Sequence, residues 1–286
     1  MRVGFLGLGV MGVPMARNLA RRFPLTVWNR SPSKYAALQD TNVSTAETPV
    51  QVVEQSDIIF MMLLDGPAIE SILSNDFRRA LRGKTIINST SVLIPFSISL
   101  AEIISNAGGD YLEMPVSGSK LPAEQGQLLG LIAGDPKIAD SVRPFLEPIT
   151  SASIYCGPVG SGLKAKYAVS TFATITAVGI AESMNFARAI GLDLEAFGQI
   201  LAVCPMSSAY SRMKVPKIQN KDWSPQATIK ISDYSAQLIE AAAAETNTRL
   251  PLLRACTLLQ EEAIKDGIGD EDMIAIVKTI AKRGDP

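Results

Sequence analysis

Short apolar runs alternate with amphipathic stretches along the first 160 residues of the chain. The clearest runs are Val3–Leu6, Leu25–Trp28 and Asp57–Leu64, and apolar residues fill the last of them without alternation, which is typical of a buried strand. Helical spacing follows the first two runs, over Met11–Arg21 and from Pro32 to Leu38. Strands that alternate with helices at this spacing predict a parallel sheet with helices on both faces.

The same alternation continues to about residue 160. Further strands are predicted at Lys84–Asn88, Asp110–Glu113, Gln127–Ala133 and Ser153–Cys156, and a helix that runs to about Ser105 follows the first of these. The first half of the chain therefore has the pattern of an α/β domain.

The pattern changes after Gly162. From Leu163 to Ile190 there is no proline and one glycine, and apolar residues recur at helical spacing, so we expect one helix of about 27 residues and about 40 Å. Gly191 is a suitable C-cap for it, and Asp193 a suitable N-cap for the next helix. Helices are also predicted over residues 194–203, 207–218, 228–246, 251–266 and 270–282. We therefore expect two domains, residues 1–161 and an all-α domain of residues 162–286, joined by the long interdomain helix.

The amino-acid composition limits the kinds of catalytic and metal-binding site that the chain can form. The 286 residues contain no histidine, which excludes a Ser-His-Asp triad and any histidine metal site, so no metal is expected. A proton-transfer residue must then be a lysine, a tyrosine, a cysteine or a carboxylate. The formal net charge of −1 gives no electrostatic footprint for nucleic acid.

Three sequence features bear on the cellular compartment of the protein. No apolar run is long enough to span a membrane, and the start of the chain does not resemble a targeting segment. The three cysteines, Cys156, Cys204 and Cys256, are far apart and show no metal or redox spacing. We therefore expect a cytoplasmic protein without a membrane partner.

A glycine-rich turn follows the first predicted strand. Gly7-Leu8-Gly9-Val10-Met11-Gly12 has the pattern G-x-G-x-x-G and opens a predicted helix, which is the context that a dinucleotide-binding turn requires. Gly7 allows the tight turn, Gly9 lets backbone amides approach a pyrophosphate, and Gly12 permits close packing of helix and strand. The turn predicts a doubly wound sheet of the Rossmann type that binds a dinucleotide.

The end of the second predicted strand indicates which dinucleotide. Sites for NAD usually place a carboxylate there, about 20 residues after the glycine turn, to bind the ribose hydroxyls. This chain has Asn29-Arg30-Ser31 instead, and the Arg30 guanidinium can bind a 2′-phosphate. The sequence therefore favours NADP(H) as the cofactor.

Three motifs in order resemble the β-hydroxyacid dehydrogenases, a family that includes the 3-hydroxyisobutyrate dehydrogenases. They are the glycine turn, the segment Glu113-Met114-Pro115-Val116-Ser117-Gly118-Ser119, and Gly160-Ser161-Gly162 followed by Lys166. The stretch from Glu113 to Leu128 looks most like the glyoxylate/succinic semialdehyde reductase branch. The resemblance covers essentially the whole chain and implies a reductase or dehydrogenase of carbonyl or hydroxy-acid substrates.

The resemblance also implies roles for single residues. Lys166 matches the family's essential lysine, and a partly desolvated ammonium in a cleft can act as the general acid. Ser117, Gly118 and Ser119 match the loop that binds the substrate carboxylate. Ser89-Thr90-Ser91 matches the family's Ser/Thr turn, so we expect Thr90 at the nicotinamide end. Leu63 and Leu64 are expected to line the cofactor channel.

Three positions depart from the family's pattern. Ser170 stands where the family usually has an asparagine that orients the substrate, and Ser232-Asp233 where it commonly has Lys-Asp. Pro225 stands at a position that is usually aromatic. Ser170 and Asp233 remain expected substrate-binding residues. Because a positive charge is missing, we expect a carbonyl substrate that is bulkier or less charged than glyoxylate.

Other functions are compatible with the same scaffold. Imine reductases resemble this family throughout but usually have another residue in place of the lysine, and phosphogluconate dehydrogenases are longer and carry a histidine after it. A non-catalytic cofactor-binding module is the third alternative. A homodimer or homotetramer is also predicted. The prediction depends on the apolar stretches Ala241–Ala244 and Leu250–Leu259 and on the dimers and tetramers that members of the family form.

Overall fold

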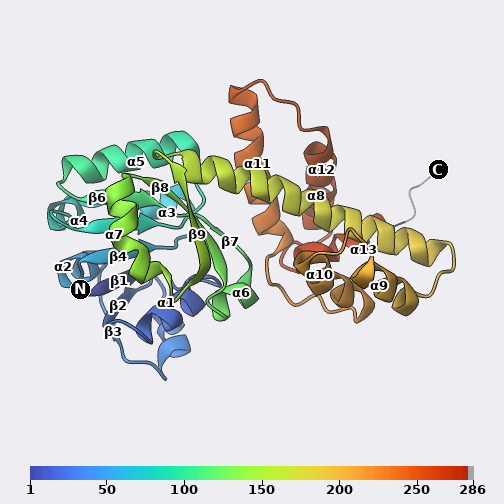
Figure 1. The fold of residues 1–286 in the computed structure, drawn as a ribbon, viewed down its shortest axis with the longest axis horizontal. Coiled ribbons are helices and arrows are strands. Elements are labelled where there is room, and N and C mark those ends of the chain that lie inside the picture. The colour runs from blue at the N-terminus through green and yellow to red at the C-terminus, as the bar shows by residue number, and fades with distance from the viewer. Residues whose placement is uncertain (283–286) are drawn as a thin grey trace. The chain divides into compact units, whose positions relative to one another are not determined.

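The computed structural model describes residues 1–282 of the chain (Figure 1). Contacts divide it into two compact units, Met1–Lys166 and residue 167 onward. The domain boundary predicted between residues 161 and 162 lies at the start of the longest helix, five residues before this division.

The first unit is built on one sheet with nine strands in the described residues. Its strands are β1 (Val3–Leu6), β2 (Leu25–Trp28), β3 (Val43–Thr45), β4 (Ile58–Met61), β5 (Thr85–Asn88), β6 (Asp110–Glu113), β7 (Val116–Ser117), β8 (Leu128–Gly134) and β9 (Thr150–Gly157). Their order is β3-β2-β1-β4-β5-β6-β8-β7, with β9 paired to β8. Strands β1 to β6 are parallel in the order 3-2-1-4-5-6, which is the order of dinucleotide-binding domains.

Helices cover both faces of this sheet, as the sequence predicts. They are α1 (Gly12–Ala20), α2 (Pro49–Gln55), α3 (Gly66–Glu70), α4 (Asn75–Ala80), α5 (Ile94–Asn106), α6 (Lys120–Glu124), α7 (Pro136–Leu146) and the 3₁₀ helix η1 (Pro32–Leu38). Every residue of β1 and β4 is buried, so both faces of the central strands are covered. The Rossmann-type fold class is confirmed.

One edge of the sheet differs from the predicted parallel arrangement. β8 runs antiparallel to both β6 and β7, while β9 is parallel to β8. Parallel neighbours need a crossover of about a dozen residues or more. Only the short helix α6 lies between β7 and β8, so the chain returns antiparallel. The expectation of an entirely parallel sheet was therefore wrong at this edge.

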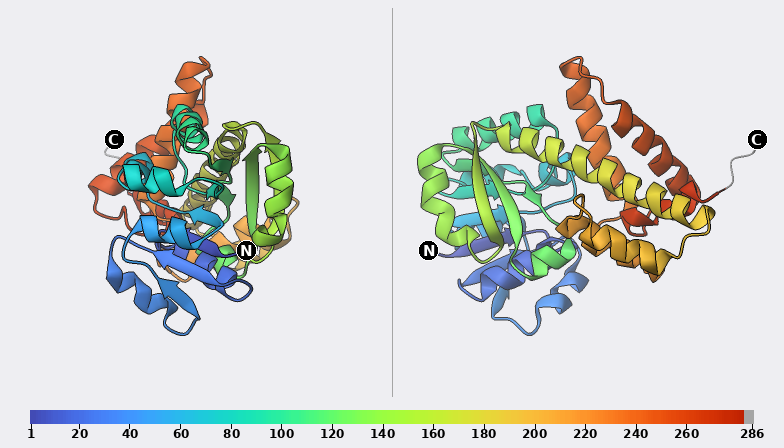
Figure 2. Two further views of the ribbon diagram at one scale, coloured as in Figure 1. Left: turned by 90° about the vertical axis from the view of Figure 1, so that its left-hand side faces the viewer. Right: turned by 45° about the vertical axis from the view of Figure 1, so that its right-hand side comes forward.

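The second unit is helical, as predicted. Residues 167–282 contain no named strand, only an isolated bridge between Thr228 and Asp272. The helices are α8 (Ser161–Ala189), which begins in the first unit, α9 (Leu194–Val203), α10 (Ala209–Gln219), α11 (Ile229–Glu245), α12 (Pro251–Lys265), η2 (Met273–Ile276) and α13 (Val277–Ile280). α11 and α12 lie side by side as a helical hairpin (Figure 2). No helix within residues 1–282 meets the length and hydropathy needed to cross a bilayer.

Helix α8 has 29 residues and is about 44 Å long. Gly191, with a φ of +83°, follows its end, and the Asp193 carboxylate accepts a hydrogen bond from Ala196 N at 2.9 Å. Both predicted caps are therefore present. The predicted last helix, 270–282, is instead the two short helices η2 and α13.

A buried ion pair ties the second unit together. Lys214 Nζ on α10 lies 2.6 Å from Asp272 Oδ1, and the two side chains are 1% and 0% exposed. The carboxylate also accepts from Gln226 N at 2.9 Å and from Ile274 N at 3.0 Å. Asp272 therefore organises the turn that leads into η2.

Candidate cofactor-binding and catalytic site

The glycine turn joins β1 to α1, and its first and last glycines are required by close backbone contacts. Gly7 has a φ of +102°, and a Cβ there would lie 2.3 Å from the carbonyl oxygen of Met62. A Cβ at Gly12 would lie 2.0 Å from the carbonyl oxygen of Gly7. Both positions therefore exclude a side chain, in keeping with the tight turn predicted at Gly7 and the close packing predicted at Gly12.

The middle of the turn is open. No atom of the described residues lies within 4 Å of a Cβ built on Gly9, and Val10 is 61% exposed, while Leu8 is buried and Met11 half-buried. Within residues 1–282, α1 has neither an acidic residue in its first turn nor a side-chain N-cap bond. Val13 N donates to the Gly9 carbonyl at 3.1 Å, and no side chain of the described residues caps the other N–H groups at this end, which is the positive end of the helix dipole. These residues fit a pyrophosphate group.

Asn29 links the end of β2 to this turn. Its Oδ1 accepts a hydrogen bond from Leu8 N at 2.8 Å, and its Nδ2 donates to the Ser31 carbonyl at 3.0 Å. Arg30 and Ser31 are exposed beside it. The structure therefore gives Asn29 a positioning role in the turn and leaves the Arg30 and Ser31 side chains open to a ligand.

The ends of β4 and β5 are tied to each other near the same sheet edge. Thr90 is 1% exposed, and its Oγ1 accepts from Leu63 N at 2.9 Å. Thr90 N in turn donates to Asn88 Oδ1 at 3.1 Å. Leu63 is half-buried, and Leu64 is 66% exposed. The Thr90 hydroxyl thus holds the Leu63 backbone, and its contact with nicotinamide stays a prediction.

A buried carboxylate accepts hydrogen bonds from backbone amides at the start of α8. Glu113, at the end of β6, is 0% exposed, and its two oxygens accept from Gly160 N at 3.0 Å and Leu163 N at 2.8 Å. Ser97 Oγ donates a third hydrogen bond at 2.6 Å. A Cβ at Gly162 would lie 2.9 Å from Glu113 Oε1 and 2.5 Å from the Leu131 carbonyl oxygen, so glycine is needed there.

This arrangement positions Lys166, which lies on α8 about one turn after Gly162. Because Glu113 satisfies N–H groups of the first turn, the direction of α8 is fixed to the end of β6. From the sequence, Glu113 was identified only as the start of a motif, and this role was missed. The signal was present, since an acidic residue ending a buried strand needs donors, and Gly160-Ser161-Gly162 offers free backbone amides.

Lys166 has the electrostatic character of a proton donor. Its side chain is half-buried, and burial lowers its pKa to about 8. Its place near the N-terminus of α8 also disfavours a positive charge. Ser170 is half-buried one turn further along the helix. By contrast, Lys164 is exposed, as the sequence predicts.

The predicted substrate loop follows β7. Ser117 ends the strand and is half-buried, as is Ser119, and Gly118 between them is exposed with a φ of +129°. A Cβ on Gly118 would lie 2.7 Å from Leu128 Cδ2. Glycine therefore sets the shape of this loop, while its binding of a carboxylate stays a prediction.

The two predicted positions on α11 lie in a buried polar cluster of the second unit. Ser232 Oγ accepts from Gln260 Nε2 at 2.7 Å and lies 3.4 Å from Thr174 Oγ1. Asp233 is 8% exposed and accepts from Gln237 Nε2 at 2.8 Å, and burial raises the pKa of its carboxyl group. Among the described residues, Asp233 Oδ1 and Gln260 Oε1 have no hydrogen-bond partner.

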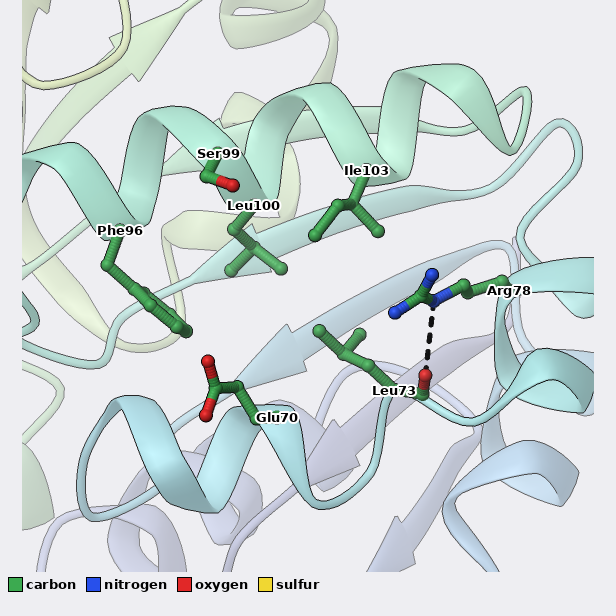
Figure 3. A pocket seen from close by; sticks show the side chains of 7 residues that line it. All are labelled: Glu70, Leu73, Arg78, Phe96, Ser99, Leu100 and Ile103. Carbon is green, nitrogen blue, oxygen red and sulfur yellow. Dashed lines mark hydrogen bonds between the residues drawn. The ribbon is translucent and has the colours of Figure 1, made fainter.

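A pocket of about 150 Å³ lies between α3, α4 and α5 and is separate from these residues (Figure 3). Its apolar lining comes from Leu73, Phe96, Leu100 and Ile103, and Glu70, Arg78 and Ser99 line it as well. Arg78 Nε donates to the Leu73 carbonyl at 3.1 Å. Residues 1–282 contain no cluster of three or more His, Cys, Asp or Glu side chains that could hold a metal ion.

Comparison with known proteins agrees with this geometry. The family model described as the NAD binding domain of 6-phosphogluconate dehydrogenase matches residues 2–157. The model described as NAD-binding of NADP-dependent 3-hydroxyisobutyrate dehydrogenase matches residues 160–280. Glyoxylate/succinic semialdehyde reductase 1 of Arabidopsis thaliana is 31% identical over 284 residues, which are 98% of each chain.

Two solved structures share the fold. A 3-hydroxyisobutyrate dehydrogenase of Mycobacterium tuberculosis, solved with L-serine, has a TM-score of 0.86 at 23% identity and covers 98% of this chain and 99% of its own. An imine reductase from Pseudomonas sp. has a TM-score of 0.69 at 20% identity and covers 98% and 99%. Both halves of the chain match models of NAD(P)-binding dehydrogenases, and the identity to a reductase extends over nearly its whole length. The chain therefore belongs to the β-hydroxyacid dehydrogenase family of NAD(P)-dependent oxidoreductases.

Proposed function

We propose that the protein is an NADP(H)-dependent reductase of an aldehyde or keto acid, in which Lys166 is the general acid and, in the reverse direction, the general base. The observation that carries this proposal is a half-buried lysine with a pKa of about 8, on a helix whose start is fixed by Glu113. A group whose pKa lies near neutral pH is well suited to proton transfer.

Each residue of the site has its own proposed role in the reduction. Bound NADPH supplies the hydride that reduces the carbonyl carbon. The Lys166 ammonium donates the proton to the carbonyl oxygen, so that an alcohol and a neutral amine result. Ser117, Gly118 and Ser119 offer a hydroxyl and backbone amides to a substrate carboxylate, and Ser170 offers a second hydroxyl one helical turn from Lys166.

The preference for NADP(H) over NAD(H) rests on Arg30. Its exposed guanidinium follows Asn29, which is itself bonded to the glycine turn, and no carboxylate stands at this strand end to bind ribose hydroxyls. Arg30→Ala is expected to raise KM for NADPH about tenfold or more, because a charge-assisted hydrogen bond contributes about 1.5–3 kcal/mol. Initial-rate measurements with both cofactors check this.

The same substitution should leave KM for NADH nearly unchanged. Arg79→Ala, which removes an exposed arginine on α4, is the matched control and should alter neither constant. Equal losses with both cofactors would contradict the assignment of Arg30 to the 2′-phosphate.

The substrate class follows from the second unit. Ser232 occupies the position of the family's usual lysine and is buried and held by Gln260 and Thr174, so an uncharged side chain stands where the family has a positive charge. A carbonyl compound that is bulkier or less charged than glyoxylate suits such an environment better than a small carboxylate does. Asp233 is the other α11 residue that we assign to substrate binding.

The activity is tested by following the consumption of NADPH with a panel of carbonyl compounds and cyclic imines. The panel includes glyoxylate, succinic semialdehyde and uncharged aldehydes. Turnover of aldehydes or keto acids supports the proposal, whereas turnover of imines alone would identify an imine reductase. Tight NADPH binding without turnover of any compound would favour a non-catalytic module.

We place this activity in the cytoplasm. The three cysteines of the described residues are free, which suits a reducing compartment.

A further inference from the structure

Tyr111 is a buried tyrosine that the proposed mechanism does not yet use. It is 6% exposed on β6 and stands two residues before Glu113, so the two side chains lie on the same face of the strand. A phenylalanine would pack its ring in the same way without the cost of burying a hydroxyl group. The hydroxyl group therefore needs an explanation of its own.

The Tyr111 hydroxyl has a hydrogen-bond partner on each side. It lies 3.1 Å from Asn88 Nδ2, at the end of β5, and 2.8 Å from Ser97 Oγ, on α5. Ser97 Oγ in turn lies 2.6 Å from Glu113 Oε2. Asn88, Ser97 and Glu113 are each 0% exposed. These four side chains, here called the Tyr111 network, therefore form one buried series of hydrogen bonds.

The direction of each bond in the Tyr111 network follows from the hydrogens that are available. The Glu113 carboxylate accepts, so Ser97 donates its single hydroxyl hydrogen to it. Ser97 Oγ then accepts from the Tyr111 hydroxyl, whose oxygen accepts from Asn88 Nδ2. Burial raises the pKa of Tyr111, so its hydroxyl keeps the proton that it donates. A buried network whose members are all satisfied is rigid.

One end of the Tyr111 network reaches the expected cofactor channel. Asn88 Oδ1 accepts from Thr90 N at 3.1 Å, and Thr90 Oγ1 accepts from Leu63 N at 2.9 Å. Thr90 and Leu63 stand at the strand ends where we expect the nicotinamide. The Tyr111 hydroxyl is thus joined to the backbone of this channel through consecutive hydrogen bonds.

The other end of the Tyr111 network lies at the start of α8. Glu113 accepts from Gly160 N and Leu163 N, and Leu163 precedes Lys166 by three residues on the helix. A change in the orientation of the Glu113 carboxylate would release these amides and loosen the helical turn that leads to Lys166.

We propose that Tyr111 is a positioning residue for the reduction, because its hydroxyl ties the strand ends of the cofactor channel to the carboxylate that holds the start of α8. Lys166 is thereby kept at a fixed place relative to the nicotinamide. The inference rests on the proposed function, since Tyr111 acts through the proton transfer assigned to Lys166. A displacement of about 1 Å can cost about 100-fold in rate, so a rigid connection between the two sites matters for catalysis.

Tyr111→Phe tests the proposal, because it removes the hydroxyl group and keeps the ring. We expect kcat with the best substrate of the panel to fall about tenfold or more, because Lys166 is less well placed. KM for NADPH should stay unchanged, since the glycine turn and Arg30 are not part of the network. Thermal unfolding will verify that the variant is folded at the assay temperature.

Tyr155→Phe is the matched control. The Tyr155 hydroxyl donates to the Gly134 carbonyl at 2.8 Å, which is also the length of the bond between Tyr111 and Ser97. Tyr155 is outside the Tyr111 network, so its variant should keep both kcat and KM. An equal loss of kcat in the two variants, or an unchanged kcat in Tyr111→Phe, would overturn the proposal.

Hydrogen exchange of backbone amides gives a readout that does not depend on activity. The amides of Gly160 and Leu163 should exchange about tenfold faster in Tyr111→Phe than in the unaltered protein, because local opening becomes easier. Exchange in Tyr155→Phe should be unchanged, and equal exchange in all three proteins would overturn the proposal. If the unaltered protein reduces no carbonyl compound, the proposed function fails, and these exchange rates alone decide whether Tyr111 holds the start of α8.

Ser97→Ala breaks the next bond of the network and serves as a second variant if Tyr111→Phe does not fold. It should show the same loss of kcat and the same faster exchange. If both residues act through one series of bonds, the double variant should lose no more kcat than the weaker of the two single variants retains. Losses that multiply in the double variant would show that the two residues act independently and would contradict the network.

Discussion

Replacing Lys166 with methionine is expected to lower kcat for carbonyl reduction by about 10²–10⁴-fold, which is the usual contribution of a positioned general acid. Methionine keeps the length and the apolar stem of the side chain but has no proton to donate. KM for NADPH should change little, because the proposed cofactor contacts lie in the glycine turn and at Arg30. Steady-state kinetics with the best substrate of the panel measures both constants.

The control for this variant is Lys164→Met. Lys164 is exposed on the same helix, two residues earlier, and its loss should leave kcat unchanged. Thermal unfolding distinguishes a catalytic loss from misfolding. Since burial disfavours the Lys166 cation, Lys166→Met is expected to stabilise the fold at pH 7, by at most about 3 kcal/mol for a pKa that falls from 10.5 to about 8. A variant that retains kcat would contradict the role of general acid.

The pH dependence of the unaltered enzyme follows from the same pKa. Reduction needs the ammonium form of Lys166, so kcat/KM for reduction should be constant below pH 8 and fall about tenfold per unit above it. Oxidation of the corresponding alcohol needs the neutral amine and should instead rise as the pH increases towards 8. Identical profiles in both directions would show that another group titrates.

Removal of the Lys214 side chain is expected to cost about 3–5 kcal/mol of unfolding free energy, because Lys214→Ala leaves the Asp272 carboxylate charged and buried without its cation. The backbone donors of Gln226 and Ile274 remain, but they compensate only part of that charge. Urea unfolding at pH 7 measures the loss.

Lys230→Ala is the matched control for this prediction. Lys230 Nζ lies 2.7 Å from Asp270 Oδ2, almost the same distance, but these side chains are 52% and 81% exposed. An exposed pair contributes about 1 kcal/mol or less. Similar losses from the two substitutions would show that burial does not govern the stabilising contribution of these ion pairs.

The central fold was predictable because its signals are local. β1 and β2 have the predicted ends, and α8 differs by only one or two residues from the predicted helix. The strand predicted over Asp57–Leu64 is limited to Ile58–Met61, because its neighbour β1 ends at Leu6 and Leu6 pairs with Met61. Apolar character shows where a strand can lie, whereas the pairing partner determines where it stops.

The elements that were not predicted are short. The contacts that were not predicted join residues far apart in the sequence. β3 and β7 have three and two residues, too few for a periodic pattern. The contact of Glu113 with Gly160 joins residues 47 positions apart, and no spacing rule relates them. The glycine motif, by contrast, is recognisable within six consecutive residues and could be predicted from the sequence, although the carbonyl that excludes a side chain at Gly7 belongs to Met62.

The hydrogen bond between Asn29 and the glycine turn has a consequence for the redesign of coenzyme preference. An obvious route to NADH dependence would place an aspartate at the end of β2 to hold the ribose. At position 29 the new carboxylate could still accept from Leu8 N, but it would lose the Nδ2 donor to the Ser31 carbonyl and bring a negative charge next to the phosphates. Arg30 and Ser31, whose side chains are exposed, are therefore the positions at which a designer has freedom to change the coenzyme.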